Sequence, residues 1–109
     1  MRREIVFAPQ AVEDEKRLRA NQRATVRDKI KQHLRRDATK TSRSRIKRLR
    51  GLKRPQYRLR VDDIRVFYDV TEEAVEILAI VPKAEAAAWL ERYGKPAPES
   101  RTDKEGEKS

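Results

Sequence analysis

The sequence predicts an α+β fold in which a small antiparallel sheet is packed by helices. Apolar residues alternate with polar ones over residues 57–70, which is the period of strands with one buried face. Residues 21–34 instead space their apolar residues three and four apart, as a helix does. Residues 83–93 are rich in Ala, the strongest helix former. We therefore expect an N-terminal strand, a helical hairpin, a three-strand meander and a short closing helix.

The N-terminal third of the chain predicts one strand and two helices. Residues 3–7 are rich in strand formers, and Pro9 suits the first turn of a following helix over residues 11–20. Asn21 is the expected cap of a second helix. One face of that helix carries Val26, Ile30, His33 and Leu34. Because His33 lies in this apolar stripe, we expect it to be a partly buried structural residue.

The middle of the chain predicts a basic lead-in followed by a hairpin. Residues 37–54 are polar and basic, with Gly51 as a turn signal, and are expected to form a loop that leads into a strand. Residues 57–61 and 64–70 then form two strands joined by a turn at Asp62 and Asp63. The alternation places Arg58, Arg60 and Arg65 together on the outward face.

The last third predicts the middle strand of the sheet, a closing helix and a tail. Residues 75–81 are almost all apolar, as in a strand that is covered on both faces. Pro82 ends this strand, and a helix over residues 83–93 follows, in which Trp89 is expected to cover the core. We assign residues 1–94 to one domain and residues 95–109, which lack large apolar side chains, to a disordered charged tail.

The positive charge of the chain is concentrated in one segment. The whole sequence carries a formal net charge of +10, but residues 35–60 hold twelve Lys or Arg and one acid. A patch this dense favours a polyanion, because each neutralised phosphate releases condensed counterions. A solvated loop or attraction to anionic lipid are the alternatives. The candidate nucleic-acid-binding residues are Arg43, Arg45, Lys47, Arg48, Arg50, Lys53 and Arg54.

The composition also restricts the classes of site and location that we expect. The chain has no Cys and a single His, so neither disulfides nor a conventional zinc site is expected, and we predict no cofactor. No apolar run is long enough to cross a bilayer, and the first residues lack the hydrophobic stretch of a secretory signal. We expect a cytoplasmic protein without a membrane partner.

Three stretches of the sequence resemble the RelE/ParE superfamily of toxins from bacterial type II toxin–antitoxin systems. They are residues 7–11 (FAPQA), residues 47–52 (KRLRGL) and above all residues 57–61 (YRLRV), which continue into residues 64–68 (IRVFY). The resemblance covers roughly residues 3–94. It implies the fold predicted above, with a concave sheet face as the active surface, and a cognate antitoxin protein as partner.

The resemblance implies two different activities on nearly the same scaffold. RelE-like members cleave messenger RNA on the ribosome, with contacts to ribosomal RNA, whereas ParE-like members inhibit DNA gyrase without catalysis. In the ribonuclease members, the positions that carry the reaction match Arg58, Arg60, Arg65 and Lys83 of this chain. These four are our candidate catalytic residues.

RNA cleavage through the 2′-hydroxyl requires a base, charge stabilisation at phosphorus and an acid for the departing oxygen. Arginines stay protonated, so they supply charge, and Lys83 is the candidate base. The chain departs from the ribonuclease pattern at Ala84, where an arginine is common, and at Trp89, near which a tyrosine is common; Tyr93 follows one turn later. The leading hypothesis is a ribosome-dependent mRNA endonuclease that inhibits translation. The alternatives are a gyrase inhibitor and a nucleic-acid-binding protein without toxicity.

Overall fold

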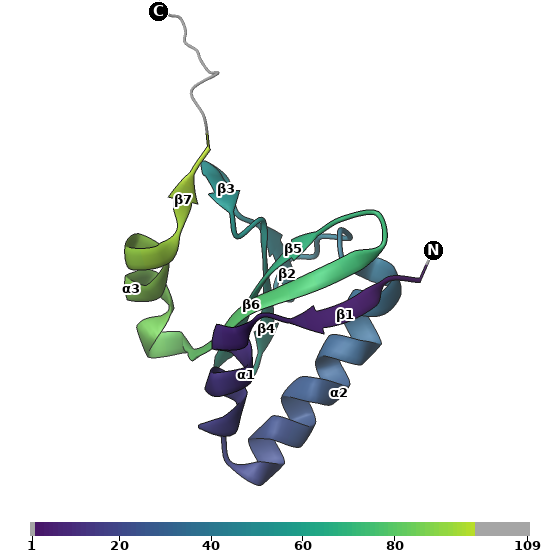
Figure 1. Ribbon diagram of the computed structural model, residues 1–109, viewed down its shortest axis with the longest axis vertical. Coiled ribbons are helices and arrows are strands. Elements are labelled where there is room, and N and C mark those ends of the chain that lie inside the picture. Colours follow the sequence, from purple (N-terminus) through teal and green to yellow (C-terminus); the bar gives the residue numbers. More distant parts are fainter. Residues whose placement is uncertain (1, 98–109) are drawn as a thin grey trace, which may run out of the picture.

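A computed structural model describes residues 2–97 and shows a mixed sheet with helices on both faces (Figure 1). The helices are α1 (Pro9–Lys16), α2 (Ala20–Asp37) and α3 (Lys83–Tyr93). The strands are β1 (Glu4–Phe7), β2 (Ile46–Arg48), β3 (Leu52–Arg54), β4 (Tyr57–Val61), β5 (Ile64–Val70), β6 (Ala74–Pro82) and β7 (Lys95–Pro96). The predicted α+β class, with its helical hairpin, meander and closing helix, is confirmed.

The main sheet has five strands in the order β1-β6-β5-β4-β2. Strands β4, β5 and β6 form the predicted antiparallel meander, and Asp62, with a φ of 51°, makes the turn between β4 and β5. Strand β1 pairs in parallel with β6, so the sheet is mixed rather than wholly antiparallel. The basic lead-in, expected to be a loop, contains β2, which pairs with β4, and β3. Strands β2 and β3 were not predicted because each has only three residues, most of them polar. Such short segments show no clear alternation of apolar and polar residues.

The helical hairpin covers one face of the sheet. Val26, Ile30 and Leu34 are almost completely buried against the sheet, and His33 beside them is partly buried, as the helical spacing predicts. The expected cap at Asn21 is wrong, because α2 already begins at Ala20 with Arg19 as its N-cap. The backbone N–H of Arg19 donates to Gln22 Oε1 at 3.4 Å, so the N-cap lies two residues before the expected position.

A buried carboxylate joins α1 to β6. Strand β1 ends at Phe7, opposite Ile77, whereas β6 continues to Pro82, so the outer edge of β6 has no partner strand beyond that point. Asp14 is only 4% exposed, and its Oδ2 accepts the backbone N–H of Ile80 at 2.9 Å. Its Oδ1 accepts bonds from Gln10 and Arg17. The side chain thus replaces the missing strand, because a buried N–H without an acceptor is costly.

An ion pair joins the two helices of the hairpin. Both nitrogens Nε and Nη2 of Arg27 on α2 donate to the buried carboxylate of Glu15 on α1, with 2.8 Å between Nη2 and Oε1. This hydrogen bonding holds the pKa of Glu15 below its usual value of 4.5, against the opposing effect of burial.

We expect this ion pair to make stability fall in acid. A carboxyl group with a lowered folded-state pKa stabilises the fold above its unfolded pKa, and this contribution disappears as the pH falls through the folded value. Urea denaturation from about pH 6 to pH 3 should therefore show a loss below pH 4.5 that is smaller in Glu15→Gln. If the stability of the wild type and that of Glu15→Gln fell equally with pH, the Glu15–Arg27 ion pair would not be the cause of the loss.

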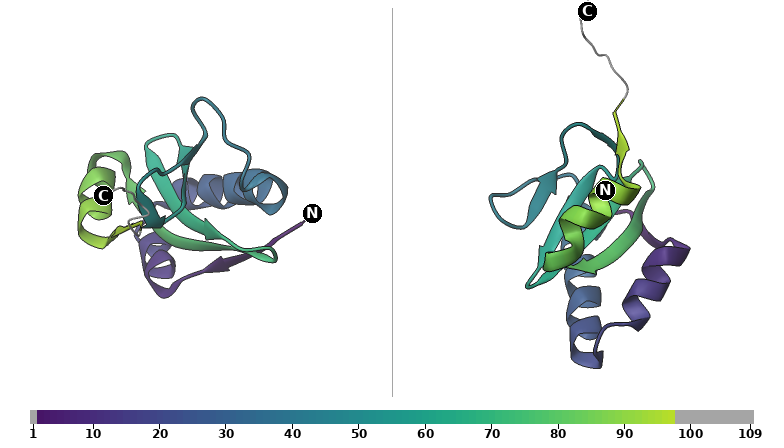
Figure 2. Two further views of the ribbon diagram at one scale, coloured as in Figure 1. Left: turned by 90° about the horizontal axis from the view of Figure 1, so that it is seen from above. Right: turned by 90° about the vertical axis from the view of Figure 1, so that its left-hand side faces the viewer.

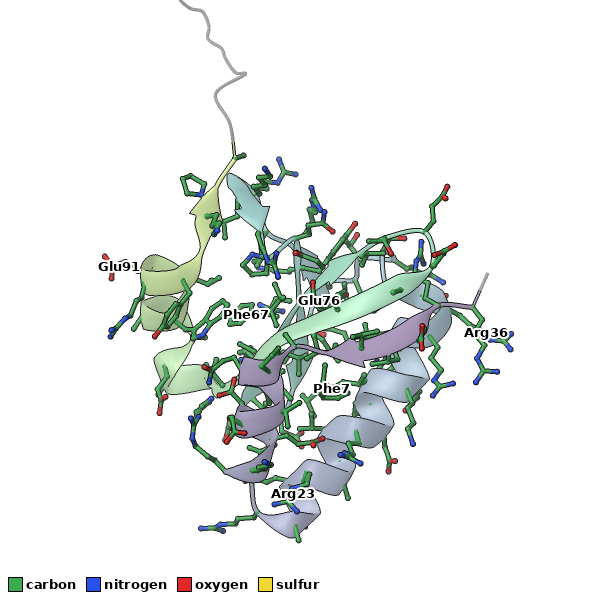
Figure 3. The ribbon with its side chains drawn as sticks, viewed as in Figure 1. Phe7, Arg23, Arg36, Phe67, Glu76 and Glu91 are labelled. Carbon is green, nitrogen blue, oxygen red and sulfur yellow. The ribbon has the colours of Figure 1, made fainter. Side chains whose placement is uncertain are left out.

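The closing helix covers the opposite face of the sheet. Phe67 on β5 is fully buried and stacks on Trp89 of α3, with ring centroids 5.0 Å apart and planes inclined by 7°. Figure 3 shows Phe67 between α3 and the sheet, and Figure 2 shows α3 apart from the hairpin helices. Trp89 is therefore a core cover, as expected. Residues 75–81 lie in β6, which is an interior strand of the sheet, as expected. The middle strand of the five is β5 instead, because β2 adds to the sheet beside β4, on the side away from β6.

The structure also changes the start of the predicted tail. Lys95 and Pro96, assigned to the tail, form β7 and pair with β3, and the N–H of Ala97 donates to the carbonyl of Gly51 at 2.9 Å. This pairing joins the end of α3 to the basic segment. The rest of the predicted tail, residues 98–109, lies outside the described residues.

Candidate nucleic-acid interface

Three arginines on β4 and β5 meet on the face of the sheet that bears α3. We call Arg58, Arg60 and Arg65 the arginine cluster. Arg60 lies directly opposite Arg65 in the pairing of the two strands, and Arg58 lies opposite Phe67. The same pairing puts Lys47 of β2 opposite Arg58. The side-chain alternation therefore places all three arginines on one face, as the sequence predicts, and like charges directly opposite each other destabilise a sheet.

Arg58 has the most unusual surroundings of the three. Its side chain is half-buried, Nη2 donates to the carbonyl of Ser44 at 3.3 Å, and the buried Nε has no hydrogen-bond acceptor. Burial, followed by the positive charges of Arg65 and Arg60, lowers the pKa of the Arg58 guanidinium. Within residues 2–97, no carboxylate forms an ion pair with any member of the cluster. The cluster is therefore an uncompensated positive site.

Arg65 differs from its neighbours because it is almost completely buried. The residue is 7% exposed, and its Nη1 donates to the carbonyls of Asp62 and Ile64 at 2.8 and 3.1 Å. The strand alternation predicted an outward side chain, but this face of β5 is buried beneath the helix. Arg65 is consequently less accessible than Arg58 and Arg60, and its bonds to the two carbonyls support the turn between β4 and β5.

Lys83 and Tyr93 lie at opposite ends of α3. Lys83 is the exposed first residue of the helix, and its backbone N–H donates to the carbonyl of Asp63 at 2.6 Å, beside the turn between β4 and β5. Tyr93 is the last residue and is 54% exposed. Ten residues of helix separate them by about 15 Å. Tyr93 therefore does not complete a site that contains Lys83.

The seven candidate binding residues of the basic segment do not all remain available. Arg43, Arg45, Lys47 and Arg50 are exposed, as is Lys53. Arg48 is also exposed, but it lies over the ring of Tyr57, with 5.1 Å between its Cζ and the ring centroid. Arg54 forms ion pairs with Asp69 and Glu76, each at 3.4 Å. Arg54 is therefore partly neutralised, whereas Lys47 shares the face of the arginine cluster.

No group of three or more His, Asp or Glu side chains within residues 2–97 is placed to hold a metal ion. None of the helices in this range has the length and apolar character that a membrane span requires.

Comparison with known proteins identifies the family. Residues 5–87 match the sequence profile of a family described as the ParE toxin of the type II toxin–antitoxin system parDE. The match covers most of the chain. The protein belongs to the ParE toxin family. A comparison with curated proteins finds no match.

Solved toxin–antitoxin complexes share the fold of this ParE-family toxin. A chain of the RelB–RelE complex from Methanococcus jannaschii matches with a TM-score of 0.57 and 17% identity, over 77% of this chain and 96% of that chain. The RelE–RelB complex of Pyrococcus horikoshii matches with a TM-score of 0.57 and 21% identity, over 76% and 97%. The DinJ–YafQ complex of Escherichia coli gives 0.56 and 18%, over 80% and 97%. At these identities the likeness establishes the fold.

In this ParE-family toxin, the arginine cluster is suited to bind phosphate groups. Guanidinium groups donate several hydrogen bonds in a fixed plane that matches phosphate oxygens, and a bound anion would relieve the repulsion within the cluster. Sequence patterns predicted the cluster but did not indicate that His33 and Lys40 lie close to Arg45. Neither residue carries a motif, and their proximity to Arg45 arises from the turn of the chain after α2.

Proposed function

We propose that this toxin is a ribosome-dependent mRNA endonuclease whose arginine cluster binds the scissile phosphodiester. The observation that supports this function best is the convergence of three guanidinium groups without an acidic partner. A folded domain that places Arg60 opposite Arg65 and half-buries Arg58 loses stability through repulsion. A phosphate bound among the three guanidinium groups would offset this repulsion. The positive charges of the cluster would in turn stabilise the negative charge that the phosphate accumulates during cleavage.

The reaction assigned to this site is attack of the RNA 2′-hydroxyl on the adjacent phosphorus. A P–O bond to the 2′-oxygen forms while the bond to the 5′-oxygen breaks, giving a 2′,3′-cyclic phosphate and a 5′-hydroxyl end. Arg58 and Arg60 are the accessible phosphate ligands, and the buried Arg65 adds positive charge to the cluster. Lys83, beside the turn between β4 and β5, is the proposed acceptor of the proton from the 2′-hydroxyl. Solvent water supplies the proton that the departing 5′-oxygen takes up.

The function is tested with the purified toxin, ribosomes and a defined messenger. Primer extension should show cuts that appear only with ribosomes and that follow the reading frame. The absence of cuts under conditions in which the toxin arrests growth would exclude the endonuclease.

A gyrase inhibitor without catalysis is the second candidate. It is favoured by the distance between Tyr93 and Lys83, which leaves the site without a tyrosine for proton transfer, and by the parDE description of the family. A supercoiling assay with purified gyrase separates the candidates, because an inhibitor would block supercoiling and leave messenger intact.

We also propose a cognate antitoxin and action in the cytoplasm, where ribosomes translate. The solved relatives are complexes of a toxin with an antitoxin, and an acidic segment that folds on binding would mask the basic surface. Co-expression of the cognate antitoxin should restore growth.

A further inference from the structure

A pocket with several polar lining groups lies where the chain turns from α2 into β2, apart from the arginine cluster. The pocket has a volume of about 130 Å³. His33 and Asp37 line it from the last turns of α2, and Ile46 lines it from the start of β2. The connection between the two elements contributes Lys40, Thr41, Ser42 and Arg45. Among its lining groups, two ammonium or guanidinium cations, two hydroxyls and an imidazole are hydrogen-bond donors, and Asp37 is the one acid.

The connection that forms one wall of this pocket is held by its own hydrogen bonds. The N–H of Ser42 donates to the carbonyl of Ile46 at 2.9 Å, and Ser42 Oγ accepts the N–H groups of Arg45 and Ile46 at 3.0 and 3.1 Å. Because Oγ accepts twice, its own hydrogen is left to donate. The N–H of Arg60 donates to the carbonyl of Arg45 at 2.8 Å, which fixes Arg45 to β4.

The charges that face His33 leave a surplus of positive charge. Burial, and then Arg45 and Lys29, lower the pKa of His33, while Asp37 acts in the opposite direction. Lys29 and Asp37 lie on the same helix as His33, and Lys40 and Arg45 come from the connection between α2 and β2. An anion between His33, Lys40 and Arg45 would be favoured by each of these three groups.

The pocket is directly connected to the arginine cluster. Arg58 Nη2 donates to the carbonyl of Ser44, the residue before Arg45, and β2 pairs with β4 through Ile46 and Leu59. The left view in Figure 2 shows the connection between α2 and β2 looping away from the sheet next to these strands. The pocket and the arginine cluster therefore adjoin each other across the β2 edge of the sheet.

We propose that the pocket formed by His33, Lys40 and Arg45 is a phosphate-binding subsite for the RNA that the arginine cluster holds. The identity of the polymer rests on the proposed function, whereas the affinity of the pocket for phosphate does not. The subsite would position the RNA on the toxin without taking part in bond cleavage.

The single histidine of the chain provides a direct measurement. The proton NMR signal of the His33 ring is titrated with pH, with and without inorganic phosphate. Bound phosphate stabilises the imidazolium and should raise the pKa of His33. Arg45→Gln should weaken phosphate binding about tenfold, because a charge-assisted hydrogen bond is lost.

Arg36→Gln is the matched control, since Arg36 does not line the pocket and points away from α2 at the edge of the molecule (Figure 3). It removes the same charge and should respond to phosphate like the wild type. The proposal is overturned if phosphate leaves His33 unchanged in the wild type, or if Arg45→Gln responds as strongly as Arg36→Gln.

A second arm uses a short RNA whose 2′-hydroxyl groups are blocked. This RNA should raise the pKa of His33 at a lower concentration than inorganic phosphate does. Arg58→Gln should weaken the response to RNA and leave the response to inorganic phosphate unchanged. A response to phosphate without any response to RNA would mean an adventitious ion only and would refute the subsite. The measurement needs no cleavage, so a toxin that fails the endonuclease assay can still pass or fail here.

Discussion

Replacing Arg58 by Gln is expected to reduce ribosome-dependent mRNA cleavage by about 10²–10³-fold, the loss typical when one donor that stabilises transition-state charge is removed. Arg58 has a buried Nε without an acceptor and two neighbouring guanidinium groups, so its charge is available to an entering phosphate. The rate is measured by primer extension on a defined messenger under single-turnover conditions.

The same substitution separates activity from stability. Removing one of three like charges relieves repulsion, so the free energy of unfolding should change by less than about 1 kcal/mol. Arg92→Gln, at the exposed end of α3, is the charge-matched control and should cleave like the wild type. Equal cleavage by Arg58→Gln and Arg92→Gln would refute the assignment of the site. Arg65 is a poorer test, because its bonds to the carbonyls of Asp62 and Ile64 support the hairpin.

Replacing Asp14 by Ala is expected to destabilise the domain by about 3 kcal/mol, because the N–H of Ile80 loses its charged acceptor in a buried position. For a small domain with a total stability of about 5–15 kcal/mol, this loss is large. Urea denaturation measures it as a lower midpoint with an unchanged slope.

Glu13→Ala is the control for this substitution. Glu13 precedes Asp14 on α1, but it is exposed and forms only a surface ion pair with Lys16 at 3.3 Å. Its removal should change stability by less than about 0.5 kcal/mol. If the two variants were equally stable, the carboxylate of Asp14 would not be the substitute for a strand at the edge of β6.

The periodicity of the sequence predicted the helices and strands themselves better than it predicted which of them pack against one another. The alternation in residues 57–70 correctly placed Arg58 and Arg60 on one face, because successive side chains of a strand point to opposite sides. It also placed Arg65 on this face but gave the wrong exposure, since alternation says nothing of a helix that returns over the strand from later in the chain. For the same reason, the parallel pairing of β1 with β6 could not be predicted from either segment alone.

Local sequence was sufficient for the fold class, the hairpin of helices on Val26, Ile30 and Leu34, and the density of positive charge in residues 35–60, because these depend on residue type and spacing. Tertiary packing then determined how each charge is used. It buries Arg65, pairs Arg54 with Asp69 and Glu76, and brings His33 to Arg45. Desolvation and charge pairing depend on neighbours that are distant in sequence, and these effects distinguish the arginine cluster from the rest of the basic surface.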